Sequence, residues 1–233
     1  MRKSHFITVI IIVAFVVIGC NNRANSDKIA NENEEVEHQD EIVGNNISEE
    51  IGNQGKFVKT IGAYDFTELG LAIYQGDLNT AKKLIEEGAS KNSCLADPIF
   101  EYDVLYASVM FDKIKFVEYF ISTEKDVNKV YSENGMTLLT LACKSDNNGI
   151  ALRISKILLD AGADVNGGGD MGFDYILYPL FEAIKKDNVQ LVKLLIDKGA
   201  DITVVDKQGE TIYTLIDGFD VSDEMKDYVN SLR

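Results

Sequence analysis

The sequence predicts an all-α domain of about five stacked helix pairs, which fills residues 61–233 of the 233-residue chain. Apolar residues in this part recur at helical spacing, and one pattern of two short helices occurs five times. Each copy is too short to bury its own apolar face, so the copies have to stack on one another. Residues 1–19 and 20–60 differ in composition from this part and are treated separately below.

The clearest copy is "YPLFEAIKKDNVQLVKLLIDKGADI", residues 178–202. Pro179 suits the first position of a helix, because the N–H that proline lacks would be unpaired there in any case. Leu180, Ala183 and Ile184 then lie on one face of this helix. The first half of the copy therefore predicts an inner helix with one apolar side.

A second helix is predicted in the other half of this copy, where Val189, Val192 and Leu195 have helical spacing. Gly199 follows, and glycine suits the left-handed residue that commonly ends a helix. Related strings occur elsewhere in the chain: "TELGLAIYQGDLNTAKKLIEEGAS", "YDVLYASVMFDKIKFVEYFISTEKDVN", "TLLTLACKSDNNGIALRISKILLDAGADVN" and "GETIYTLIDGFDVSDEMKDYVNSL".

These strings resemble ankyrin repeats, above all in "LLDAGADVN" and "LLIDKGAD". The small residue of the family's inner helix falls at Ala72, Ala107, Ala142 and Ala183, close to the family period of about 33 residues. The gap from Ala142 to Ala183 is longer, and we expect residues 148–151 to interrupt the third helix pair. The resemblance implies an ankyrin-repeat solenoid with β-hairpin-like fingers, which binds other proteins.

The N-terminus has an apolar run, Phe6–Ile18, preceded by Arg2 and Lys3. A membrane-spanning helix needs about 20 apolar residues, so this shorter run indicates a secretory signal peptide, residues 1–19. The end of the run, "VIGC", resembles the lipobox of bacterial lipoproteins, in which Cys20 receives diacylglycerol and becomes the first residue. An ordinary signal peptide, or an uncleaved anchor, is the alternative.

Residues 20–60 are rich in Asn and Glu and lack periodicity, which predicts a flexible acidic tether behind the lipidated Cys20. The whole chain has a net charge of −15. Nucleic acid is therefore excluded as an expected partner, because phosphate binding needs a clustered basic surface. Anionic lipid headgroups would also repel the domain, so membrane attachment has to come from Cys20.

The sequence offers little for catalysis. Both histidines, His5 and His38, precede the repeats, so the folded domain has no histidine for a catalytic triad or a zinc site. Asp164, Asn166 and Asp170 occupy three positions of a calcium loop, but Tyr175 stands where the bidentate glutamate belongs. We predict no enzyme activity, catalytic residue, metal, cofactor or small-molecule substrate.

Cys143 falls on a predicted inner helix and Cys94 in a connecting segment, and we expect both to be free thiols, with Cys143 serving packing. A reactive thiol at Cys143 is the less favoured alternative. The two cysteines lie in different layers of the predicted stack, too far apart for a disulfide bond.

Partner binding is expected on the concave surface that inner-helix edges and finger tips form in ankyrin repeats. Aromatic residues there are candidate anchors. For Phe173 and Tyr175, in the long loop before the fourth unit, packing of the rings against the inner helices is an equal alternative. The predicted partner-binding residues are Tyr74, Gln75, Met110, Phe111, Lys144, Met171, Phe173, Tyr175, Lys185 and Lys186.

The sequence as a whole predicts a membrane-anchored lipoprotein of a bacterial cell envelope, on the periplasmic or the cell-surface face, whose repeats bind another protein. Two roles fit this class: an immunity protein that masks an envelope-acting toxin, and a protective partner of an envelope enzyme. The alternative is a passive structural envelope lipoprotein without a specific client.

Overall fold

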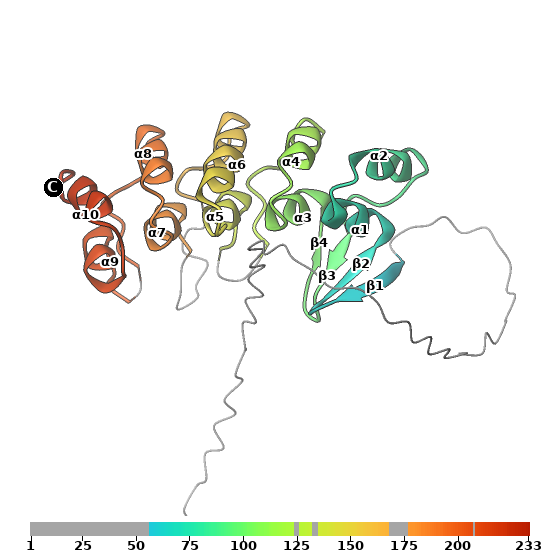
Figure 1. The fold of residues 1–233 in the computed structure, drawn as a ribbon, viewed down its shortest axis with the longest axis horizontal. Coiled ribbons are helices and arrows are strands. Elements are labelled where there is room, and N and C mark those ends of the chain that lie inside the picture. The colour runs from blue at the N-terminus through green and yellow to red at the C-terminus, as the bar shows by residue number, and fades with distance from the viewer. Residues whose placement is uncertain (1–55, 124–125, 132–134, 168–176, 207) are drawn as a thin grey trace, which may run out of the picture. The chain divides into compact units, whose positions relative to one another are not determined.

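A computed structural model describes residues 56–123, 126–131, 135–167, 177–206 and 208–233. This part of the chain is mostly helical, with ten helices in five consecutive pairs and four strands in one sheet (Figure 1). The elements are β1 (Phe57–Ile61), β2 (Tyr64–Thr67), α1 (Glu68–Gln75), α2 (Leu78–Glu86), β3 (Leu95–Ala96), β4 (Glu101–Tyr102), α3 (Val104–Met110), α4 (Ile114–Ile121), α5 (Leu138–Cys143), α6 (Asn148–Asp160), α7 (Pro179–Lys185), α8 (Val189–Asp197), α9 (Ile212–Gly218) and α10 (Asp223–Asn230).

The helices lie in two rows, with the odd-numbered helices in an inner row and the even-numbered helices in an outer row (Figure 1). Each inner helix contacts the next, from α1 to α9, and contacts also join α4, α6, α8 and α10. The core runs between the rows as a single cluster of buried apolar side chains. No described helix has the length and apolar character needed to span a membrane.

The copy at residues 178–202 folds as its sequence predicts. Pro179 is the first residue of α7, and Leu180, Ala183 and Ile184 are buried. In the next helix Val192 and Leu195 have no exposed surface, and Gly199 has a φ of 93° after the helix end. The predicted succession of two helices and a left-handed glycine is therefore confirmed.

Threonine and aspartate side chains start the inner helices. Thr67, Asp103, Thr137 and Thr211 each accept a hydrogen bond from the backbone N–H three residues later, in the first turn of α1, α3, α5 and α9. These bonds satisfy donors that a helix leaves unpaired at its N-terminus. Threonine therefore caps α1, α5 and α9, and aspartate caps α3.

The four strands form an antiparallel sheet in the order β1-β2-β3-β4. Gly62 joins β1 to β2 with a φ of 62°, a conformation that favours glycine in two-residue hairpin turns. The hairpins β1–β2 and β3–β4 precede α1 and α3, where hairpin-like fingers were expected. The sequence did not predict that the two hairpins join into one sheet, or that β1 begins at Phe57, inside the segment expected to be a tether.

The expected interruption at residues 148–151 is wrong, because these residues form the first turn of α6. The side chain of Asn147 caps this turn by accepting a hydrogen bond from the N–H of Ile150. Ala151 and Ile154 are buried on one face of the helix. The extra residues therefore lengthen the outer helix of the third pair instead of breaking it.

Two asparagines join the loops that follow α4, α6 and α8. Asn128 donates to the carbonyl of Gly162 at 3.1 Å and accepts from the N–H of Asp164 at 2.7 Å. Asn166 makes the same pair of bonds one repeat later, to the carbonyl of Gly199 at 3.5 Å and from the N–H of Asp201 at 2.8 Å.

We expect Asn128→Ala to lower the free energy of unfolding by about 1 kcal/mol, because it leaves two backbone groups without their partner. Urea denaturation followed by circular dichroism measures the loss. Asn79→Ala, on the exposed side of α2, is the control and should be neutral or slightly stabilising, since alanine is the better helix former. Equal stability of Asn128→Ala and the wild type would contradict a role for these bonds in holding the repeats together.

Candidate protein-binding face

The predicted partner-binding residues that the structure describes lie at equivalent places, the C-terminal ends of successive inner helices. Tyr74 and Gln75 end α1, Met110 ends α3, and Lys185 ends α7. The residues directly after α3, α5 and α7 complete the set, which we call the helix-end row: Tyr74, Gln75, Met110, Phe111, Lys144, Lys185 and Lys186. The other predicted residues, Cys20, Met171, Phe173 and Tyr175, lie outside the described residues.

Three aromatic rings meet at one end of this row and form what we call the aromatic shelf, Phe66, Tyr74 and Phe111. The rings of Tyr74 and Phe111 meet edge to face, with centroids 5.1 Å apart. Phe66, from β2, lies against both at 5.4 and 5.7 Å. Phe66 is buried, whereas Tyr74 is 40% exposed, so the shelf supports an aromatic ring that solvent can reach.

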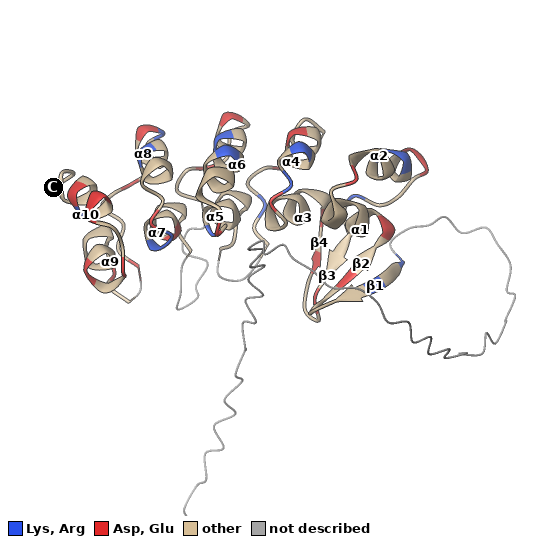
Figure 2. Ribbon diagram, viewed as in Figure 1, with Lys and Arg blue, Asp and Glu red and all other residues tan. Residues whose placement is uncertain are grey.

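The lysines at the other end of the row are paired with carboxylates. Lys186 forms an ion pair with Asp146 of the preceding repeat. Lys185 lies 3.4 Å from Glu182, one turn earlier on α7, and its ammonium also stands over the ring of Phe219 at 5.6 Å. Figure 2 shows acidic and basic residues together on α7. The positive charges of these two lysines are therefore partly neutralised.

Asp112 and Asp187 make the turns between the inner and outer helices of the second and fourth pairs. Their φ values of 57° and 52° are uncommon for residues other than glycine, asparagine and aspartate. Each accepts a hydrogen bond from a serine of the next repeat, Asp112 from Ser145 and Asp187 from Ser222, both at 2.9 Å. In each turn, therefore, one aspartate both adopts an uncommon backbone conformation and forms a hydrogen bond between repeats.

Asp112→Asn should stabilise the protein at neutral pH. Burial, with the nearby Asp146 carboxylate, raises the pKa of Asp112 above its ordinary value, against the hydrogen bond from Ser145. The folded state therefore prefers the neutral carboxyl, and ionisation costs stability once the pH rises above the ordinary pKa of about 3.9. Asparagine avoids this cost and tolerates the left-handed backbone.

Allowing for solvent screening, we expect Asp112→Asn to raise the free energy of unfolding by about 0.5 kcal/mol at pH 7, and this gain should vanish below about pH 3. Thermal unfolding at both pH values measures it. Asp227→Asn, at an exposed position within α10, is the control and should leave the free energy of unfolding nearly unchanged. A gain for Asp112→Asn at pH 3 equal to that at pH 7 would contradict the electrostatic explanation.

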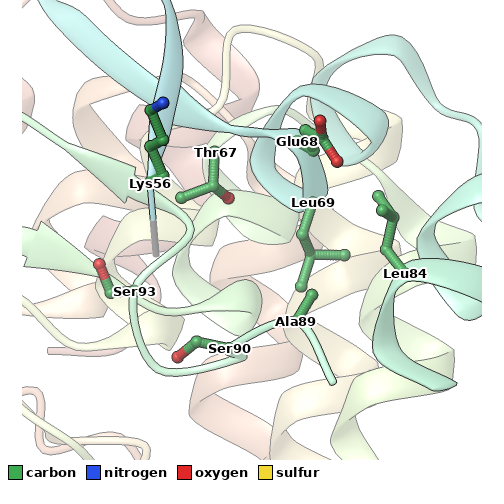
Figure 3. Close-up of a pocket in the computed structure, with 8 residues that line it drawn as sticks. All are labelled: Lys56, Thr67, Glu68, Leu69, Leu84, Ala89, Ser90 and Ser93. Carbon is green, nitrogen blue, oxygen red and sulfur yellow. The ribbon is translucent and has the colours of Figure 1, made fainter. Parts of the chain in front are cut away.

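Two cavities among the described residues offer no evident small-molecule site. The pocket in Figure 3 lies where the start of α1 meets Leu84 of α2 and the loop at Ala89–Ser93, and its volume of about 10 Å³ is room for one water molecule at most. A more open hollow of about 390 Å³ has Asp103 and Lys129 in its wall. These two side chains form an ion pair at 2.7 Å, and Asp103 also caps α3, so they already serve the fold.

Cys94 and Cys143 are fully buried and neither is joined in a disulfide bond. Burial raises the pKa of the Cys143 thiol to about 12, and burial together with the charge of Asp103 raises the pKa of Cys94 well above its ordinary value. Thiols held in the neutral form are poor nucleophiles. Within the described ranges, no group of three or more His, Cys, Asp or Glu side chains could hold a metal ion.

Sequence reasoning missed three residues of this face: Phe66, Asp146 and Glu182. A signal for Glu182 was available, because a glutamate three residues before a lysine on one helix is a common pair. Phe66 directly precedes the capping Thr67, so aligning "DFTEL" with the start of the repeat pattern would have placed it beside α1. Asp146 is 40 residues from its partner Lys186, and no local pattern reveals that contact.

Part of this chain is similar to known proteins, two of which are named for ankyrin repeats. Human "Ankyrin repeat and SOCS box protein 6" is 30% identical over 151 residues, which cover 64% of this chain and 33% of that protein. "Putative ankyrin repeat protein L371" of Acanthamoeba polyphaga mimivirus is 30% identical over 131 residues, 56% of this chain and 16% of the viral protein. "Palmitoyltransferase AKR1" of Lachancea kluyveri is 31% identical over 145 residues, 60% of this chain and 19% of that protein.

The chain thus spans about a third of the human protein's length and less of the other two. A family model of three ankyrin repeat copies matches residues 69–169, and a model of the single ankyrin repeat matches residues 177–207. The two matches together span more than half of the 233 residues, and the chain belongs to the ankyrin-repeat family.

Proposed function

We propose that this protein is a lipid-anchored component of a bacterial cell envelope, and that its ankyrin repeats form a solenoid that binds another protein through the helix-end row. Ankyrin repeats generally mediate contacts between proteins. The single observation that carries the proposal is the aromatic shelf, where Phe66 and Phe111 hold the 40% exposed ring of Tyr74 in place. Rigid, partly exposed aromatic rings are typical interface anchors.

The chain acts by binding and not by catalysis. Its two histidines lie at positions 5 and 38, before the repeats. Its two buried cysteines have thiols with raised pKa values. These are the residue types that most often serve as general base and nucleophile, so their placement supports a binding protein.

The client is an envelope protein that this chain neutralises or protects, as an immunity protein or as a protective partner. To test this, the full-length chain is tagged and purified from membranes in mild detergent. One protein should co-purify in equal molar amount. Recovery of the chain without a stoichiometric companion, under conditions in which the chain stays folded, would favour a passive structural role and contradict the proposal.

Cys20→Ala should abolish lipidation. In a lipoprotein the thiol of Cys20 carries the diacylglycerol, and two or more acyl chains are needed for stable membrane attachment. Feeding cells a clickable fatty acid should label the native protein and leave the Cys20→Ala variant unlabelled. Cys94→Ala is the control and should be labelled like the wild type, because Cys94 is buried in the repeats. Equal labelling of the native protein and the Cys20→Ala variant would overturn the lipoprotein assignment.

A further inference from the structure

The turn between β3 and β4 presents an apolar side chain to solvent. Its residues are Asp97, Pro98, Ile99 and Phe100, and we call it the finger turn. Ile99 is 79% exposed, more than the other exposed large apolar side chains of the described residues. An isoleucine on a frayed loop would need no explanation, so the rigidity of this turn decides what its exposure means.

Asp97 holds the turn in one conformation. Its carboxylate accepts hydrogen bonds from the N–H groups of Ile99 and Phe100, at 2.8 and 2.7 Å, and from the hydroxyl of Tyr102 at 2.6 Å. Burial alone would raise the pKa of Asp97, but these bonds outweigh it and hold the pKa below its ordinary value, so the carboxylate stays ionised at neutral pH.

The turn is also fixed to the helices. The N–H of Asp97 donates to the carbonyl of Phe100 at 2.9 Å. The ring of Tyr102 stacks on Tyr106 of α3, with centroids 4.1 Å apart. Ile99 is therefore held in the solvent by a rigid support, and little conformational entropy would be lost when a partner covers it.

Acidic residues lie beside the turn on the solvent face of the sheet. In the strand register Asp65 of β2 pairs with Ala96 of β3, which in turn pairs with Glu101 of β4, so the three share one face. Asp65 and Glu101 are exposed, and among the described residues neither belongs to an ion pair with lysine or arginine. Figure 2 shows these strands with acidic residues in red.

We propose that the finger turn is a second contact site, at which Ile99 enters an apolar pocket on a folded protein and Asp65 and Glu101 face lysine or arginine side chains at the rim of that pocket. The charges favour a basic partner surface over a second copy of this chain, because each copy would bring the same acidic face and a net charge of −15. The site rests on the proposed protein-binding function, and it defines the chemistry of the partner.

Photo-crosslinking in the full-length chain tests the site. The probe is p-benzoylphenylalanine, placed in separate variants at positions 99, 74 and 86, and irradiated in membranes of cells that express the chain. Position 86 is the control, because Glu86 is exposed and lies on the outer helix α2, away from the fingers and the inner-helix ends. Position 99 should cross-link to a peptide in which apolar residues adjoin lysine or arginine, and position 86 should not cross-link.

Affinity for the protein identified in this way gives the second readout. Ile99→Asp should weaken binding by about 30-fold, the effect of losing an anchor worth about 2 kcal/mol, whereas Ile99→Val should change it little. Glu101→Lys should slow association at low salt, and Glu86→Lys, at an exposed position on α2, should not. Melting curves of these variants should match the wild type, because the changed side chains are exposed.

Each other outcome has a defined meaning. Cross-links from position 74 without any from position 99, or an unchanged affinity in Ile99→Asp, would overturn the finger site and leave protein binding by the helix-end row intact. Absence of cross-links from both positions 74 and 99 would overturn the protein-binding function and the finger site together.

Discussion

Gly70→Ala should lower the free energy of unfolding by about 3 kcal/mol. A Cβ atom at position 70 would lie 1.9 Å from the carbonyl oxygen of Cys94 and 2.9 Å from its carbonyl carbon. Both obstacles are backbone atoms, so no side-chain rotation relieves the clash. The same carbonyl accepts hydrogen bonds from the N–H of Thr67 at 3.1 Å and from its hydroxyl at 3.3 Å, and a shift of Cys94 would weaken both.

Urea denaturation of the wild type and the Gly70→Ala variant measures the loss, and Gly149→Ala is the matched control. Gly149 is also helical, in the first turn of α6, but its added Cβ would meet only the Asn147 side chain at an ordinary 3.5 Å. Alanine is the better helix former, so this variant should be as stable as the wild type or up to about 1 kcal/mol more stable. Wild-type stability in Gly70→Ala would show that the sheet does not lie this closely against α1.

Lys185→Met should cost about 3 kcal/mol, because it leaves the carboxylate of Glu182 buried without its cation. The two side chains are 14% and 9% exposed, with nitrogen and oxygen 3.4 Å apart. Methionine keeps most of the length and the apolar contacts of lysine. The loss would therefore come mainly from the unpaired charge, with a smaller part from the ammonium over Phe219.

The double variant Glu182→Leu, Lys185→Met separates these contributions. Removing both charges should restore most of the stability, since an apolar pair of similar size is often as good as a buried ion pair. Lys193→Met is a surface control and should lie within about 0.5 kcal/mol of the wild type, because its pair with Glu224 is exposed. Losses from the two single changes that simply add in the double variant would contradict a coupled pair.

The ion pair of Lys185 with Glu182 limits which substitutions at Lys185 can test partner binding. Charge reversal at Lys185 or Lys186 would be the obvious test of these two predicted partner-binding residues. In the structure a negative residue at 185 would stand beside buried Glu182, and one at 186 would stand beside Asp146. Charge reversal would then affect folding as well as binding, so exposed Tyr74 is the better probe of this face.

The helix pairs were predictable because their signals are local. Small residues such as Ala72 and Ala183 and left-handed glycines such as Gly199 occur at equivalent places in several of the copies. The sheet was not predictable, because β3 and β4 contain two residues each, too few to show an alternation of apolar and polar side chains. Their pairing depends on contacts between repeats that the sequence does not reveal.

The candidate sites were likewise predictable where the signal is local and unpredictable where it depends on contacts between distant residues. The helix-end row follows from the repeat register, which places Tyr74 and Phe111 at equivalent helix ends. The support beneath them, Phe66, and the ion pair of Lys186 with Asp146 join different elements. Exposure of Ile99 depends on the turn that Asp97 holds, and the string "DPIF" alone does not distinguish an exposed isoleucine from a buried one.

Protein binding through the aromatic shelf is the central claim, and the affinity of Tyr74→Ala for the co-purified protein tests it most directly. Tyr119→Ala, in the outer helix α4, is the control, because Tyr119 is also partly exposed and lies in the other row. We predict that Tyr74→Ala weakens binding by about 30-fold and also lowers the melting temperature modestly, because its ring contacts with Phe66 and Phe111 are lost, and that Tyr119→Ala binds like the wild type. An unchanged dissociation constant in a folded Tyr74→Ala variant would contradict the claim.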